Sequence, residues 1–119
     1  MSYDVSFRRP TVEPHQDCRA HHVDPATAPD LAWHNHTSNT AGVWRAVGLD
    51  LTLFDRRPAG ALIAPLDDAI TRIAADPCAF DRHVRGGGSW GTVESTLGFL
   101  RALRASAEEY PASTVEVSS

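Results

Sequence analysis

A periodic apolar run in the last third of the chain most constrains the fold. Apolar residues recur there at steps of three and four, the spacing that places side chains on one face of an α-helix. They are Val93, Leu97, Leu100, Leu103 and Ala107. Gly91 or Thr92 can cap the start of this helix, and Pro111 ends it near Tyr110. A helix with one apolar face must bury that face, so we expect this one to pack on the core.

A second helical stripe lies in the middle of the chain. Its apolar members are Leu62, Ile63, Leu66, Ile70, Ile73 and Ala74. Pro65 either lies in the first turn of this helix or kinks it. Asp76 and Pro77 end it and begin a short helix that reaches His83. Another two-turn helix is expected over residues 41–47, closed by Gly48.

Strands are predicted at both ends of the chain and once near its middle. Residues 3–9 alternate between apolar and polar side chains, as a half-buried strand does. Residues 31–39 place Leu31, Trp33, Asn35 and Thr37 on one strand face, and Ala32, His34 and His36 on the other. Residues 114–117 alternate again, whereas residues 49–53 form either a short strand or an extended connector.

Together these elements predict one α+β domain over residues 1–119. Strands at the two chain ends, with helices between them, favour a two-layer arrangement. We expect a small antiparallel sheet of about three strands (N-terminal, middle and C-terminal), covered on one face by three to four helices. Residues 10–30 are poor in apolar side chains and hold three prolines, so they are predicted to be a long loop or insertion.

Charge and composition narrow the class of partner. The chain has 119 residues and a formal net charge of -4, which argues against nucleic acid, because neutralising phosphates requires a basic surface. Neither a signal peptide nor an apolar run of membrane-spanning length is seen, so we expect a cytoplasmic protein with no membrane partner. Cys18 and Cys78 are far apart, and a disulfide between them is possible but not implied.

Several short motifs resemble a group of small proteins of unknown function encoded by actinobacteria and their phages. They are Tyr3-Asp4-Val5-Ser6, Asn35-x-Thr37-x-Asn39, Trp44 with Gly48, Ala59-Gly60 before Pro65, Asp76-Pro77, Trp90-Gly91 and the segment from Pro111 to Ser118. The resemblance covers most of residues 31–118 and implies the same order of strand, helices and strand. It implies no activity, and residues 16–27 look like an insertion relative to the group.

Histidines and a cysteine suggest a possible metal site. The candidate ligands are His15, Cys18, His21 and His22 in the predicted loop, with His34 and His36 on the strand that follows. Imidazole and thiolate are the usual ligands of zinc, but this spacing matches no established zinc motif. The alternative is a chance accumulation of histidines in a solvated loop. We therefore predict no cofactor, with zinc as the alternative.

A glycine-rich turn before the long helix is a candidate anion site. Free backbone N–H groups and the helix dipole favour negative charge at such a position. The residues concerned are Arg82 and Arg85, followed by Gly88 and Ser89. The alternative is a turn whose glycines supply positive φ angles.

A third candidate combines amide and hydroxyl groups with aromatic planes, which can bind a polar or planar ligand. Its members are Asn35, Thr37, Asn39, Trp44 and Trp90. The alternative is structural: Asn39 caps a helix, Asn35 and Thr37 bind backbone, and the tryptophans fill the core.

No motif for nucleophilic or paired-carboxylate catalysis is present, so an enzyme is the less favoured class. We expect a small accessory protein that binds a protein partner or a small polar or anionic ligand, with a homo-oligomer also possible. The alternatives are a small metal-dependent enzyme that uses the His and Cys residues, and a phage-type protein that sequesters a nucleotide.

Overall fold

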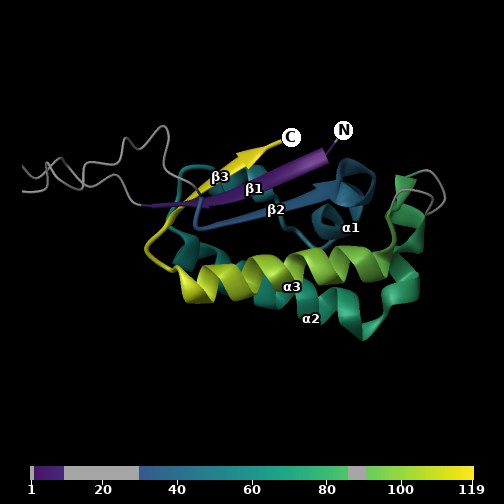
Figure 1. The fold of residues 1–119 in the computed structure, drawn as a ribbon. Coiled ribbons are helices and arrows are strands. Elements are labelled where there is room, and N and C mark those ends of the chain that lie inside the picture. The colour runs from purple at the N-terminus through teal and green to yellow at the C-terminus, as the bar shows by residue number, and fades with distance from the viewer. Residues whose placement is uncertain (1, 10–29, 86–90) are drawn as a thin grey trace, which may run out of the picture.

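Three antiparallel strands form the sheet of this α+β protein, with the N-terminal strand in the centre. The computed structural model describes residues 2–9, 30–85 and 91–119. Strand β1 (Ser2–Arg8) lies between β2 (Ala32–Thr37) and β3 (Thr114–Ser118), which gives the order β2-β1-β3. Figure 1 shows the two chain ends running side by side in this sheet. The predicted N-terminal, middle and C-terminal strands are confirmed.

The register sends alternate side chains of β1 into the core. Val5 pairs with Val117, and Phe7 pairs with Val115. Phe7 and Val115 are completely buried. Because the side chains of a strand alternate between its two faces, the residues between them point away from the core. The sheet therefore has one apolar face and one polar face, as the alternation in the sequence predicted.

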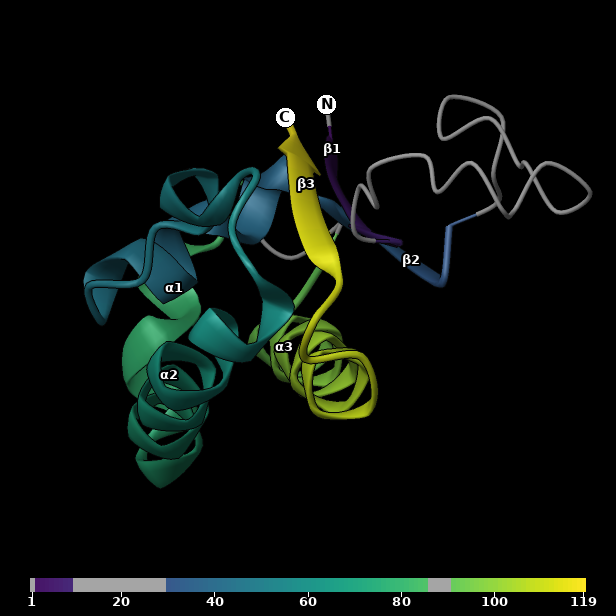
Figure 2. The same ribbon diagram turned by 90° about the vertical axis from the view of Figure 1, so that its left-hand side faces the viewer.

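Helices cover the apolar face. Helix α3 (Val93–Glu109) and helix α2 (Ile63–Ala75) run next to each other beneath the sheet, and α1 (Ala41–Ala46) lies at one end (Figures 1 and 2). Shorter 3-10 turns connect them: η2 (Ser38–Thr40), η3 (Leu51–Phe54), η4 (Ala59–Leu62) and η5 (Pro77–His83). Among the described helices, none is both long and apolar enough to cross a membrane.

The predicted apolar stripes form the core. Leu97, Leu100 and Leu103 of α3 are buried, as are Leu66 and Ile73 of α2. These residues join the inward side chains of the sheet in one apolar cluster. At about 25 cal/mol per Å² of buried apolar surface, this contact is the main favourable term in folding.

Local hydrogen bonds define the start of α3. The Thr92 hydroxyl accepts a hydrogen bond from the Ser95 backbone N–H, and the Ser95 hydroxyl accepts one from the Thr92 N–H. This reciprocal capping box satisfies two N–H groups that the first helical turn leaves unpaired. Tyr110 ends the helix before Pro111, as predicted. Pro65 lies in the first turn of α2, one of the two positions expected for it.

One segment differs from the predicted strand or connector over residues 49–53. Residues Leu51–Phe54 form the 3-10 turn η3 instead. The Asp50 carboxylate accepts hydrogen bonds from both the backbone N–H and the hydroxyl of Thr52, which closes the turn. The alternation of leucines was misleading because Leu49 and Leu51 are buried while Leu53 is 66% exposed.

The segment after η3 closes the β3 edge of the sheet. Val115 donates its N–H to the Arg57 carbonyl at 2.9 Å and accepts a hydrogen bond from the Arg56 N–H. Two successive residues thus face one residue of β3, which is a β-bulge, and Arg56 adopts the left-handed backbone at φ 65°. The Asp55 carboxylate accepts from the Val117 N–H. This edge therefore offers few free hydrogen-bonding groups.

Two glycines of the α3 region supply a matched stability test. A Cβ at Gly98 would meet no atom within 4 Å, so Gly98→Ala should raise the free energy of unfolding by about 0.5–1 kcal/mol. At Gly91 the backbone has φ +134°, and a Cβ would lie 2.6 Å from the Thr37 methyl carbon. Gly91→Ala should therefore lower the free energy of unfolding, on the order of 1–3 kcal/mol. Urea unfolding of both variants measures the difference, and equal effects would contradict the packing of α3 on β2.

Candidate binding surface

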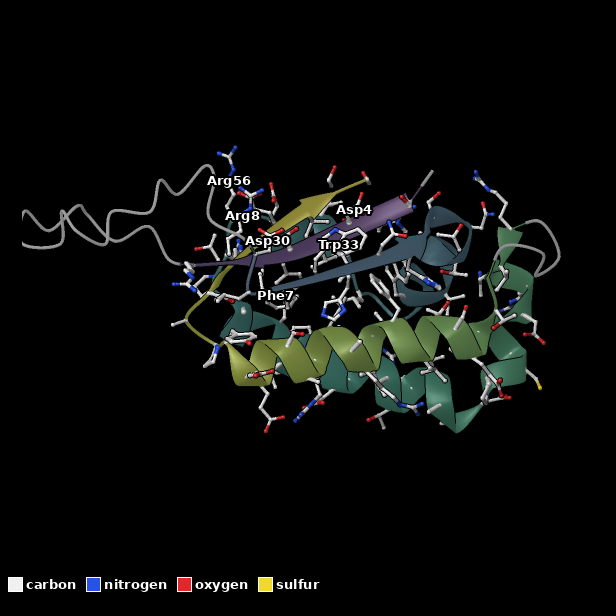
Figure 3. All side chains as sticks on the ribbon, in the orientation of Figure 1. Asp4, Phe7, Arg8, Asp30, Trp33 and Arg56 are labelled. Carbon is white, nitrogen blue, oxygen red and sulfur yellow. The ribbon has the colours of Figure 1, made fainter. Side chains whose placement is uncertain are left out.

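The polar face of the sheet carries no described helix. We call it the open sheet face and define it by the outward side chains of the three strands. They are Asp4, Ser6 and Arg8 of β1, Trp33 and Asn35 of β2, and Glu116 of β3. Figure 3 shows Asp4, Arg8 and Trp33 on this side of the ribbon, while Phe7 points toward the helices.

Trp33 is the main apolar feature of the open sheet face. Its side chain is 59% exposed, and its cross-strand neighbour is Ser6, which in turn pairs with Glu116. A small serine beside the indole leaves the ring unshielded on that side. Since a tryptophan contributes 150–250 Å² of surface when it is covered, Trp33 is the largest gain available to a ligand at this face.

Charged and amide groups around Trp33 are held by hydrogen bonds. The Arg8 guanidinium lies 3.2 Å from the Asp30 carboxylate and 3.0 Å from the Glu116 carboxylate. On the other side, the Asn35 amide donates to the Asp4 carboxylate at 2.7 Å. Exposed pairs of this kind contribute roughly 0–1 kcal/mol to stability, so their main effect is to orient the polar groups beside the indole.

Arg56 lies at the β3 edge, next to the open sheet face. Its side chain is exposed and points away from the ribbon (Figure 3). No ion pair is found for it within the described ranges, whereas Arg8 is paired twice. A free guanidinium close to paired charges is available to a carboxylate on a binding partner.

The inward side chains of β2 meet α3. His34 Nε2 lies 2.7 Å from the Ser106 hydroxyl, and its ring meets Phe7 edge-on. The His36 ring stacks on Phe99, with ring centroids 5.0 Å apart. His36 Nε2 is buried and has no hydrogen-bond partner in the described part of the chain. Burial lowers the pKa of both imidazoles below the ordinary 6.5, because the charged form loses hydration there.

Two of the predicted metal ligands, His34 and His36, lie in the described part of the chain. His34 and His36 pack between the sheet and α3, each with its own contact. Among the described residues, no group of three or more His, Cys, Asp or Glu side chains has the geometry to hold a metal ion. His15, Cys18, His21 and His22 lie outside the described residues.

Only part of the predicted anion site is described. Arg82 and Arg85 are exposed at the end of η5, and Arg82 Nε donates to His83 Nε2 at 3.3 Å. Gly88, Ser89 and Trp90 lie outside the described residues. The anion site therefore stays a prediction.

The predicted polar and aromatic group is divided between the two sides of the sheet. Trp44 is 1% exposed in the core, where it contacts Tyr3 and Phe99, whereas Asn35 lies on the open sheet face. Thr37 accepts a hydrogen bond from the Asn39 N–H and so caps η2. Asn39 and Thr40 were the two candidates to cap the helix that follows, and the N-cap position of α1 is occupied by Thr40, whose side chain makes no cap hydrogen bond.

Sequence reasoning placed Asn35 at a site but left out Trp33, Arg8 and Asp4. The signal for Trp33 was present, since the alternation of residues 31–39 assigned it to the same face as Asn35. The neighbours on β1 could not be found in this way, because they depend on the strand register.

Comparison with known proteins finds no matching family model, no matching curated protein and no matching solved structure. The function is therefore inferred from the geometry of this chain.

The β2–α3 interface predicts a pH dependence of stability. In the unfolded chain the imidazole of His36 takes up a proton near pH 6.5, but in the folded chain its pKa is lower. Between these values the unfolded state binds more protons, so the free energy of unfolding falls as the pH decreases below about 6.5. Urea unfolding across this range should show a smaller fall for His36→Phe than for the wild type.

His83→Gln, which removes a histidine of η5 outside this interface, is the matched control for that measurement. It should retain the wild-type dependence on pH. A His36→Phe protein with an unchanged pH dependence would show that His36 is not responsible.

Proposed function

We propose that this protein acts by non-covalent binding of a partner protein, and that strand β2 is the binding element. An extended segment of the partner adds to the free edge of β2, and its side chains cover Trp33 on the open sheet face. The observation that carries this proposal is the position of Trp33, exposed on the one edge strand that no other described segment closes.

The two sheet edges differ in a way that supports strand addition. The segment after η3 bonds to β3 through the backbone of Arg56 and Arg57 and the side chain of Asp55. Strand β2, in contrast, pairs with no strand other than β1 among the described segments. Natural edge strands are commonly protected by lysine, proline or a bulge. The sequence of β2, Ala-Trp-His-Asn-His-Thr, contains no proline, lysine or carboxylate. A partner strand can pair with such an edge through backbone hydrogen bonds.

Trp33 supplies the side-chain part of the interaction. Tryptophan and arginine are enriched among the residues that dominate binding energy at protein interfaces. Trp33 has Arg8 and Asn35 close by on the same face, both already oriented by hydrogen bonds. A binding surface on a strand is more rigid than one on a loop, so little order is lost when the partner binds.

The matched variants Trp33→Ala and Leu53→Ala test the binding surface. Both remove an exposed large apolar side chain, but Leu53 lies on η3, away from β2. The full chain, immobilised through one terminus, is used to capture partners from an extract, and each captured protein is purified and titrated by calorimetry. Trp33→Ala should weaken the specific complex by about 2 kcal/mol, or roughly 30-fold, and Leu53→Ala should leave it within a factor of two.

Equal affinities of wild type and Trp33→Ala for every purified partner would contradict the proposal. Sedimentation equilibrium of the protein alone shows whether a second copy of the chain, and not a different protein, binds at this edge. A dimer that Trp33→Ala dissociates would assign the surface to a second copy of the chain instead of a different protein.

A further inference from the structure

We propose that β2 is a pH-responsive element, in which protonation of His36 loosens the strand from α3 and releases the bound partner. This inference rests on the proposed function of β2, because the strand that presents Trp33 outward is the strand that carries His34 and His36 inward. Because both sets of side chains belong to one strand, protonation of His36 on the inner side moves the strand that presents Trp33 to the partner.

The contacts of His36 suit the neutral imidazole. Its ring lies nearly parallel to Phe99, with an interplanar angle of 19°, and its Nε2 atom is buried. Protonation gives both ring nitrogens an N–H, and in this position no described acceptor receives the Nε2 proton. An imidazolium held here has a buried Nε2–H that neither water nor a described acceptor satisfies, so opening of the interface is favoured.

His34 adds to the same interface but responds less. Its Nε2 bonds to the Ser106 hydroxyl, which can donate to the neutral ring or accept from the charged one. The bond to α3 thus persists in both protonation states. His36 is therefore the residue on which the pH response depends.

The charged groups around β2 do not compensate an imidazolium. From β1, the titratable side chain on the inner face is Tyr3, the cross-strand partner of His36, and its hydroxyl accepts a hydrogen bond from the cation Arg45 of α1. From α3, the facing groups are Phe99 and Ser106, which are uncharged. The 3-10 turn η2 supplies no titratable side chain.

The charged residues of α3 are engaged elsewhere or exposed. Arg104 binds Asp67 of α2 and Glu108, while Glu94, Arg101 and Glu109 are solvent-exposed. Burial is accordingly the cause of the lowered pKa of His36, with no contribution from a charged neighbour. Acidification is the change to which such a histidine responds.

Amide hydrogen exchange of the free, ¹⁵N-labelled full chain tests the loosening directly. Protection of the amides of β2 is compared with that of Val115, whose N–H bonds to the Arg57 carbonyl on the far side of the sheet. After correction for the intrinsic rate, protection of β2 should fall more than that of Val115 between about pH 7.5 and 5.5, because protonation of His36 opens the contact of β2 with α3 and leaves the far edge of the sheet paired. In His36→Phe, the amide protection of β2 and that of Val115 should fall by the same factor.

A second measurement needs no variant. The ring signals of His36 are titrated by NMR in the wild-type protein, and the loss of β2 protection should follow this titration. Equal loss at β2 and Val115 in the wild type, or an unchanged excess loss at β2 in His36→Phe, would overturn the inference.

Release of the bound partner at low pH is the third test. Protein captured through Trp33 at about pH 7.5 should elute at about pH 5.5 from the wild type and stay bound to His36→Phe. Retention by both proteins at the lower pH would contradict release. Failure of the proposed function gives a different result, because Trp33→Ala would then leave capture unchanged at every pH. The hydrogen-exchange measurement on the free chain does not depend on the partner, so it still tests the loosening of β2.

Discussion

Burial of the inner sheet face against α3 is the contact on which the rest of the structure depends. The apolar stripe that includes Leu100 and Leu103 is removed from water by packing against the strands. The inward side chains of β1 are removed from water by the same contact. This contact assigns Phe7 and Val115 to the inside and thereby assigns their neighbours to the outside. The polar open face is thus a consequence of core packing and required no additional element.

Strand β2 differs from its neighbours because its inner side is polar at two positions. His34 and His36 stand where β1 has Val5 and Tyr3. Imidazole rings fill the space beside Phe7 and Phe99, as apolar side chains would, and they retain a proton-binding nitrogen. In our proposal, partner binding on one side of this six-residue strand is coupled to proton uptake on the other side.

Most of the architecture was predictable from the sequence because its elements have strong periodic signals. The stripe of α3 and the alternation of β1 follow from local spacing, and the structure confirms them. Of the two predicted caps of α3, Gly91 and Thr92, the structure selects Thr92. The turn η3 was missed, since hydrogen bonds from Thr52 to Asp50 outweighed the leucine alternation.

The candidate surface was only partly predictable for a different reason. Asn35 and Trp33 share a strand face by local alternation, but Asp4 and Arg8 join them only through the register of β1 with β2 and β3. Residues far apart in the sequence, such as Arg8 and Glu116, become neighbours through pairing that no local pattern specifies. For the same reason, Trp44 and Asn35 looked like one group although the sheet lies between them.

Hydroxyl-radical footprinting of the free protein, read by peptide mass spectrometry, tests the two-sided character of β2 most directly. Trp33 and Trp44 have the same intrinsic reactivity but exposed fractions of 59% and 1%. Oxidation of Trp33 should be rapid and that of Trp44 slow, with Phe99 protected beneath His36. Protection of Trp33 equal to that of Trp44 would mean that the open sheet face is already covered in the free chain, and it would contradict the assignment of β2 as the binding strand.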